Sequence, residues 1–364
     1  MAAIGSQRKA LEVVGLSRGT WHYRWHPRAR VVDPVSQRER AYPSRIDRQD
    51  REAITALIQA GWGDGVSVDH SFATAWDDGV MVGSRRSWWR IAGAIEDQSA
   101  RPVTPARKNG VSGNRREAPV LIARAPMDAW SWDITDLHGP WRGVSFKAYS
   151  VMDIFSRKIV AWRVEEREVD DLAAEMFERA FGVEGIPGAV HADSGASMRS
   201  NVVANLFADL GITKTHNRPR VSNDNPYSES SFKTMKYRPG YPGMFETIEA
   251  ARAHMASYVL WHNSQHKHSG IALFSPDEVH DGTWQEKWQH RNATLAAYYE
   301  QHPERFRTRP TTPAPARIVS INLPKPAPQD QAAFQDRLDQ LRQQPTIPSQ
   351  RDPLITSLSD NLIN

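Results

Sequence analysis

Residues 130–164 read WSWDITDLHGPWRGVSFKAYSVMDIFSRKIVAWRV and decide the fold of this chain. Three runs within them, 130–135, 144–153 and 158–164, are rich in β-branched and aromatic residues. Short turns that contain Gly and Pro, or Ser and Arg, separate the runs. Such runs with turn residues between them are typical of strands that pair in sequence order. The stretch therefore predicts an antiparallel meander of three strands.

Helical and strand-like segments alternate after the meander. Apolar periodicity predicts two helices and two short strands, in the order helix 171–181, strand 189–193, helix 201–210 and strand 212–216. Pro226 suits the first position of a helix to about residue 237, and a longer helix follows over 246–261. We therefore expect an α/β fold in which helices cover a mixed sheet.

The segments outside this core are helical or irregular. Residues 7–25 predict two short helices with a turn at Gly15 and an N-cap at Ser17, which is the pattern of a helix-turn-helix motif. Further helices are predicted over 51–60 and after Ser84. Residues 100–125 are typical of a basic linker. The Pro-rich segment from about residue 310 is expected to be extended or poorly ordered, with a possible helix over 331–343.

Charge and composition narrow the class of protein. The 364-residue chain has a net charge of +7 over residues 1–125, −5 over 126–282 and +2 over 283–364. A basic front can attract DNA, whereas an acidic centre would repel phosphate unless cations offset its carboxylates. Solvated surface charge would give the same totals. The chain has no Cys, which excludes disulfides, thiolate zinc sites and a Cys nucleophile. Without an apolar run of about 20 residues or a secretion signal, we expect a soluble intracellular protein.

Three acids stand at the ends of predicted elements. Asp133 closes the first strand of the meander, Asp193 closes strand 189–193, and Glu229 lies in the first turn after Pro226. Each alone is more often a cap, turn or surface residue. Together, two carboxylates from neighbouring strands and one from a helix would suit Mg²⁺ or Mn²⁺, and two such ions can serve phosphodiester transfer.

Several stretches of the sequence, in their order along the chain, resemble a known protein family. The stretches AWSWDITDLHGPW, VMDIFSRKIVAW, HADSGASM, RPRVSNDNPYSESSFKTMKYRPGYP and WHNSQHKHSGIALFSPDEVH resemble successive blocks of the integrase-type catalytic domain. More closely, they are similar to the second-reading-frame transposases of the bacterial IS-three family. Thirty-five residues separate Asp193 from Glu229, which is the spacing of that family's DDE signature. The likeness extends over roughly residues 7–325.

The resemblance implies a fold and a division into regions. It implies a ribonuclease-H-like mixed sheet flanked by helices and preceded by a small helical DNA-binding region. The expected regions are a helix-turn-helix-like region over 1–99, a basic linker over 100–125, an integrase-type core over 126–282 and a partly flexible extension over 283–364. The implied protein works in the bacterial cytoplasm, associated with the nucleoid.

The resemblance also implies an activity and its residues. Asp133, Asp193 and Glu229 match the catalytic acids that hold two Mg²⁺ or Mn²⁺ ions for DNA cleavage and strand transfer. Lys236 matches the family's basic residue seven places after the Glu, and Lys233 is expected on the same helix face. Implied partners are DNA at the element ends and target, further copies of the chain as a homo-oligomer, and an upstream-frame segment.

Basic residues outside the core form a second set of candidates. Arg18 in the second short helix, and Arg85, Arg86 and Arg90 after Ser84, could face DNA phosphates, although an ordinary wet helix face would carry the same residues.

Other interpretations stay open. A transposase-derived DNA-binding protein or regulator without catalytic activity would share most of these blocks. Ala192, Ser194 and Ala196 depart from the family pattern, although none removes an acid. The histidines of HNSQHKHSG could suggest zinc, but packing or DNA contact is favoured, because Cys is absent and the spacing is irregular.

Overall fold

The computed structural model describes residues 6–27, 35–36, 42–102, 120–193, 200–216 and 225–323, together with residues 336 and 340. The chain divides into two compact units, Met1–Arg45 and Ile46–Asn364. In the first unit, helices α1 (Gln7–Val13) and α2 (Arg18–Trp25) flank Gly15, whose φ of 63° suits a residue without a side chain. The hydroxyl of Ser17 caps α2 by accepting a hydrogen bond from the amide of Thr20. The predicted pair of short helices is confirmed.

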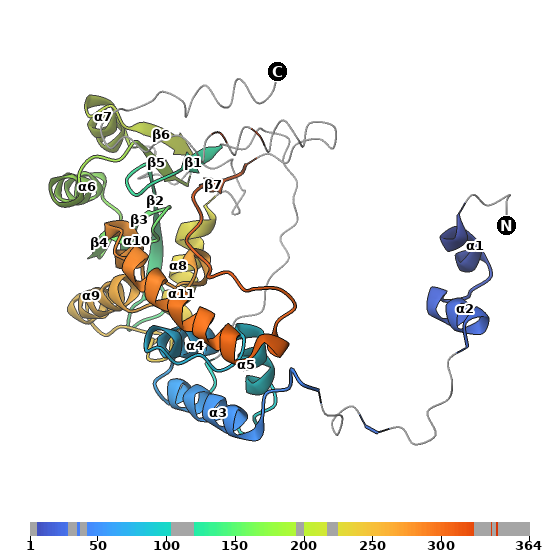
Figure 1. Cartoon of the computed structure of the whole chain (residues 1–364). Helices are drawn as coiled ribbons and strands as arrows, with labels where there is room; N and C mark the ends of the chain where they lie inside the picture. Colours follow the sequence, from blue (N-terminus) through green and yellow to red (C-terminus); the bar gives the residue numbers. More distant parts are fainter. Residues whose placement is uncertain are drawn as a thin grey trace. The chain divides into compact units, whose positions relative to one another are not determined.

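The second unit contains a five-stranded sheet with the strand order β4-β3-β2-β5-β6. Strands β2, β3 and β4 are antiparallel, and β5 and β6 run parallel to β2 (Figure 1). The predicted meander and mixed sheet are confirmed, and this topology is ribonuclease-H-like. The strands are β2 (Ala129–His138), β3 (Ser145–Asp153), β4 (Ile159–Glu165), β5 (Ala189–Ala192) and β6 (Thr213–His216).

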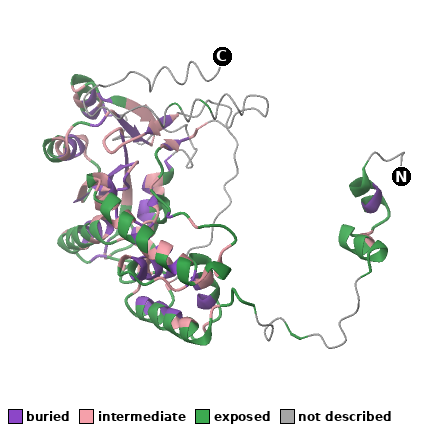
Figure 2. Ribbon diagram, viewed as in Figure 1, coloured by how far each residue is buried: buried purple, intermediate pink, exposed green. Residues whose placement is uncertain are grey.

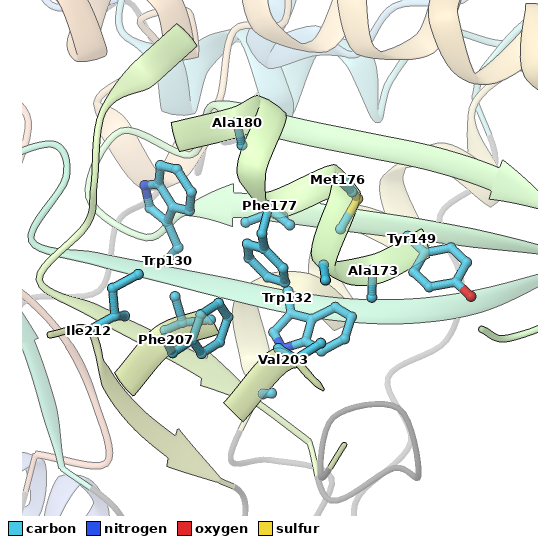
Figure 3. Packing of buried hydrophobic residues seen from close by; sticks show 14 residues of the cluster. Trp130, Trp132, Tyr149, Ala173, Met176, Phe177, Ala180, Val203, Phe207 and Ile212 are labelled. Carbon is cyan, nitrogen blue, oxygen red and sulfur yellow. The ribbon is translucent and has the colours of Figure 1, made fainter. Parts of the chain in front are cut away.

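Helices cover both faces of this sheet. On one face, α6 (Asp170–Glu184) and α7 (Asn201–Asp209) enclose an apolar cluster in which Trp130 and Trp132 of β2 pack against Phe177 and Phe207 (Figure 3). On the other face, α8 (Pro226–Tyr237) and α9 (Ile248–Ser264) enclose a second cluster, which includes Leu137. Because side chains alternate along a strand, even-numbered residues of β2 face α6 and α7, and odd-numbered residues face α8.

The helices before the sheet pack against helices that follow it. α3 (Arg48–Gly63), α4 (Val68–Asp77) and α5 (Arg85–Ala92) share an apolar cluster with Leu273 and with Leu295 of α11 (Trp284–Gln301). Their outer faces are exposed (Figure 2). The guanidinium of Arg291 is buried in this contact, where it pairs with Asp77 at 2.5 Å. The predicted helices over 51–60 and after Ser84 are confirmed, whereas α4, α11 and α10 (Pro276–Asp281) were not predicted.

Two three-residue strands connect the segment just before the main sheet with a segment that follows α11. β1 (Leu121–Ala123) pairs antiparallel with β7 (Val319–Ile321), and the pair packs on Ala129 and Ala189 of the main sheet. The segment after residue 310 was expected to be extended, and it carries β7. Short 3-10 turns occur at Ser269–Ile271 and Pro303–Arg305.

Some predictions lie outside the described residues. These are most of the basic linker, at 103–119, and the helix over 331–343. The region boundaries after residues 99, 125 and 282 stay predictions. Within the described part of the chain, no helix is both long enough and apolar enough to cross a membrane.

Candidate active site

Asp133 and Asp193 are brought together by the register of two parallel strands. Trp132 of β2 pairs with Ala192 of β5, so the two acids are the next residue along each strand. Trp132 and Ala192 both belong to the cluster under α6 and α7. Alternation therefore places both acids toward the opposite face, which α8 covers. The imidazole of His216 donates a hydrogen bond of 2.9 Å to the carbonyl oxygen of Asp193, which ties this strand end to β6.

Glu229 lies in the first turn of α8, on the same face as Asp133. Pro226 begins this helix, as predicted, because its fixed φ suits a position where no amide donor is needed. α8 lies against β2 and β3, and its apolar residues Phe232 and Met235 are buried there. The exposed amides of a first helical turn favour a nearby carboxylate such as that of Glu229.

A buried polar network fixes the start of α8 to β2. The Ser131 hydroxyl donates to the side-chain oxygen of Asn225 at 2.5 Å and lies 2.7 Å from the Ser228 hydroxyl. The side-chain nitrogen Nδ2 of Asn225 donates a hydrogen bond of 3.3 Å to the backbone carbonyl oxygen of Trp132. The helix that carries Glu229 is therefore attached to the residues that directly precede Asp133.

The charges of Asp193 and Glu229 affect the ionisation of Asp133. Burial, followed by the negative charge of Asp193, raises the pKa of Asp133 to about 7, and Glu229 and the exposed Glu168 add to this rise. A hydrogen bond from the Ile134 amide opposes it. Burial also raises the pKa of Glu229, and the Lys233 ammonium, 3.7 Å away, opposes that shift. A carboxyl that stays protonated to neutral pH is a common property of catalytic and metal-binding sites.

The chemistry of these groups fits a hard divalent cation. Carboxylate oxygens are the ligands that Mg²⁺ and Mn²⁺ prefer. A bound cation would offset both the burial that mainly raises the pKa of Asp133 and the repulsion from Asp193 that adds to it. As the side chains stand, the described residues contain no group of three His, Asp or Glu that could hold one metal ion. Asp193 and Glu229 are thus close enough to Asp133 to affect its pKa, but the three carboxylates do not converge on one metal position.

The two predicted lysines of α8 differ in their surroundings. Lys233 is 65% exposed at its side chain and pairs with Glu229. Lys236 is turned toward the sheet, where its ammonium group donates a hydrogen bond of 2.7 Å to the Thr135 hydroxyl. Burial lowers the pKa of Lys236, and the nearby Asp136 and Asp133 oppose this. The two lysines therefore lie on the side of α8 that carries Glu229 and faces the acid-bearing strand.

The predicted arginines lie away from the acids along the chain. Arg18 is exposed in α2, in the first compact unit, and α5 of the second unit carries Arg85, Arg86 and Arg90 at its surface. Arg85 forms a bidentate ion pair with Asp69, whereas Arg86 is exposed.

Residues that sequence reasoning passed over also shape this region. Asn225, Ser131 and Ser228 carry the polar network, and Glu168 adds a fourth negative charge. Only Asn225 had a local signal, because Asn often precedes a Pro that begins a helix. Asp153 is a buried turn acid and accepts hydrogen bonds from the amides of Met127, Phe155 and Ser156. The histidines from His262 to His268 pack with Trp261 and Tyr258 and form no metal-binding group in the described chain.

Comparisons with known proteins give matches to the part of the chain that carries the sheet and the three acids. Two models of the integrase core domain match residues 123–222 and 210–276. A transposase for insertion sequence element IS904 of Lactococcus lactis is 31% identical over 162 residues, which are 44% of this chain and 63% of the relative. A putative transposase for element IS150 of Escherichia coli is 24% identical over 44% of this chain and 57% of its own length. The matched segment thus spans less than two thirds of either relative.

One relative matches over more of its length, and solved structures match more distantly. A 31.7 kDa protein of insertion element IS407 from Burkholderia multivorans is 24% identical over 75% of this chain and 90% of its own length. The catalytic core domain of HTLV-2 integrase, solved with magnesium, aligns over 43% of this chain and 97% of its own, with 13% identity and a TM-score of 0.34. The corresponding domain of BIV integrase gives 21% identity over 45% of this chain and 99% of its own, with a TM-score of 0.33. From the matched models and relatives, the chain carries an integrase core domain over residues 123–276 and is similar in this part to insertion-sequence transposases.

Proposed function

We propose that this chain is a DNA transposase that cleaves and joins DNA strands by metal-dependent phosphodiester chemistry. One observation carries the proposal: Asp133 and Asp193 follow paired positions of two parallel strands, and Glu229 lies on the helix that covers the same face. The rise in the pKa of Asp133 supports it, because a group of acids without an offsetting cation is otherwise unfavourable.

In this proposal the three acids are the metal ligands, and the strands and the helix that carry them determine their positions. Asp133, Asp193 and Glu229 would hold two Mg²⁺ or Mn²⁺ ions. When bound, these ions would activate the attacking oxygen and stabilise the leaving oxygen of the phosphodiester. The register of β2 and β5 fixes the first two carboxylates, and α8 supplies the third from above the sheet.

Basic residues would position the DNA. Lys233 and Lys236 lie one and two turns beyond Glu229 and would hold phosphates next to the scissile bond. Arg18, Arg85, Arg86 and Arg90 would contribute further phosphate contacts, which position DNA without reading its sequence. The partners would be element ends and target DNA in the bacterial cytoplasm, with further copies of the chain and an upstream-frame segment completing the assembly.

The decisive experiment replaces one acid and separates binding from chemistry. Asp193→Asn should abolish cleavage and strand transfer of end-containing DNA in Mg²⁺ or Mn²⁺ and leave DNA binding in a gel-shift assay largely unchanged. The amide keeps the size of the side chain and removes its charge. Asp136→Asn is the matched control, because Asp136 lies on the same strand as Asp133 and pairs with Lys147 at the surface. Strand transfer by Asp193→Asn at the wild-type rate would refute the proposal and favour a non-catalytic DNA-binding protein.

A further inference from the structure

Asn225 does not perform the usual function of its position. It is the N-cap residue of α8, where an Asn side chain ordinarily accepts a hydrogen bond from an amide of the first helical turn. Its side chain makes no such bond. It reaches instead to β2, accepting from the Ser131 hydroxyl and donating to the Trp132 carbonyl. The capping interaction is thus replaced by two bonds between helix and strand.

The network around Asn225 is closed to water and internally satisfied. Ser131, Asn225 and Ser228 are 0%, 1% and 3% exposed. Ser131 uses its proton toward Asn225, so the Ser228 hydroxyl donates to Ser131. Burial of three polar side chains is costly unless each finds a partner, and here each partner belongs to the opposite element. The network therefore holds only one alignment of α8 on β2.

Each member of the network lies next to a proposed metal ligand. Ser131 is on the same face of β2 as Asp133, two residues earlier, and the Trp132 carbonyl belongs to the peptide unit that leads into Asp133. Ser228 directly precedes Glu229, and Asn225 lies one turn before it. A shift of α8 along β2 would change the separation between the Asp133 and Glu229 carboxylates and would break these bonds.

We propose that Asn225 is a positioning residue that sets the spacing between Asp133 and Glu229 for metal binding, with Ser131 and Ser228 as its partners. This inference rests on the proposed function, in which those two acids share divalent ions. Residues of this kind, which orient the ligands without touching the metal, commonly affect metal affinity strongly.

A second asparagine provides a matched control. Asn263 at the end of α9 accepts from the Ile159 amide and donates to the Ile159 carbonyl, each at 2.9 Å. It therefore fixes a helix to a strand through two bonds, as Asn225 does. Its strand, β4, is at the edge of the sheet, two strands from β2. Loss of either side chain should weaken a helix-to-strand contact. Of the two asparagines, Asn225 is the one whose contact connects acid-bearing elements.

The test compares Asn225→Ala with Asn263→Ala in the full chain. Hydrogen exchange is measured without metal or DNA, and the Mn²⁺ concentration for half-maximal strand cleavage is measured separately. Asn225→Ala should speed amide exchange over 133–136 and 229–233 and raise the required Mn²⁺ concentration about tenfold or more. Asn263→Ala should speed exchange near Ile159 and leave the Mn²⁺ requirement unchanged. Ser228→Ala serves in place of Asn225→Ala if the latter does not fold.

The outcomes separate this inference from the proposed function. Wild-type exchange over 133–136 and 229–233 in the Asn225 variant overturns the inference, as does an equal rise in Mn²⁺ requirement for both asparagine variants. If the wild-type protein shows no metal-dependent cleavage, the proposed function fails. The exchange data then still decide whether Asn225 fixes α8 to β2.

Discussion

The ammonium nitrogen of Lys236 lies 2.7 Å from the hydroxyl oxygen of Thr135, which is two residues beyond Asp133 on the same face of β2. A lysine near the last turn of α8 is thus anchored to the strand that carries the first acid. Its charge lies within reach of Asp136 and Asp133, which favour its protonated form against the effect of burial on its pKa. This places a cation beside the acids without direct contact with any of the three.

We expect Lys236 to act on DNA and not on stability. Lys236→Ala should leave the midpoint of urea unfolding nearly unchanged, weaken cleavage at DNA ends, and reduce the slope of log affinity against log salt by about one unit. Lys236→Glu should weaken cleavage more, because it repels phosphate. Thr135→Val removes the anchor and keeps the charge, so it should have the smaller effect. Wild-type cleavage by Lys236→Glu at physiological salt would assign Lys236 to the solvated surface.

Replacing Asp133 should stabilise the metal-free protein at high pH. The pKa of Asp133 is about 7 in the folded chain and near 3.8 when unfolded, so the folded state binds the extra proton between these values. Stability therefore falls as pH rises from about 4 to 7. At about 1.4 kcal/mol per pKa unit, the effect is at most about 4 kcal/mol. In EDTA, Asp133→Asn should melt above wild type at pH 8 and close to it at pH 4.

Mn²⁺ and a neighbouring acid provide the controls for this prediction. Added Mn²⁺ should raise the melting temperature of the wild-type protein at pH 8 and have less effect on Asp133→Asn, because the variant has lost a ligand. Asp136→Asn should give no gain at pH 8, since the ion pair with Lys147 lowers the pKa of Asp136. A lower melting temperature for Asp133→Asn than for wild type at pH 8 in EDTA would contradict the prediction.

A group of four histidines should make the protein sensitive to acid. Burial lowers the pKa of His70 and His262 to about 4, of His268 to about 3 and of His266 to about 2. The unfolded chain takes up these protons near pH 6.5, whereas the folded chain does not. Stability is therefore lost as pH falls from about 6.5 to 4. In melting experiments from pH 7.5 to 5, His266→Phe should reduce the dependence on pH, and replacement of the exposed His290 by Gln should not.

The two neighbouring arginines of α5 should differ in their effect on DNA binding. Arg85 is held by Asp69 through two hydrogen bonds, whereas Arg86 is exposed. Arg86→Ala should therefore reduce affinity for duplex DNA and the salt slope more than Arg85→Ala, measured on the full chain. Asp69→Asn should release Arg85 and strengthen binding. Equal losses for both arginines would show that the ion pair opens on DNA.

The ion pair between Arg291 and Asp77 should matter for stability. The Arg291 side chain is 1% exposed, and its remaining hydrogen bonds go to the carbonyls of Ala272 and Leu273. Asp77→Asn leaves a buried cation without its counter-charge, which typically costs about 3–5 kcal/mol. Urea unfolding should show this loss. Removal of the exposed Arg48 to Glu52 pair should leave the midpoint of urea unfolding nearly unchanged. A similar small loss for both pairs would contradict the prediction.

Most of the sheet was predictable because its signals are local. The Trp, Ile and Leu residues around Asp133 alternate with polar residues, and Pro226 and Ser84 define helix starts through their own chemistry. α10 had an unused signal, since Ser275 and Glu278 form a capping box. β1 and β7 had no such signal, because a strand of three residues is too short to show a recognisable alternation of apolar and polar residues.

The site was predictable only in part, because local patterns identify its acids but not the long-range contacts that surround them. Strand ends and family spacing nominated Asp133, Asp193 and Glu229. The bonds from Asn225 to Ser131 and Trp132 join residues more than 90 positions apart, and no local pattern encodes them. Likewise, the burial of Arg291 against Asp77 depends on two helices that meet only in the folded chain.

The pairing of β1 with β7 determines when the second unit can finish folding during synthesis. Leu121 pairs with Ile321, 200 positions later. At about 5–20 residues per second, a ribosome needs roughly 10–40 s to make the intervening chain. Until then, the apolar end of the sheet at Ala129 and Ala189 lacks the cover that Ile321 provides, and the Tyr227 hydroxyl lacks its acceptor at Ser320. The nascent core therefore depends on β7, the last strand of the described residues, and a chain released before residue 321 would expose this edge to chaperones and proteases.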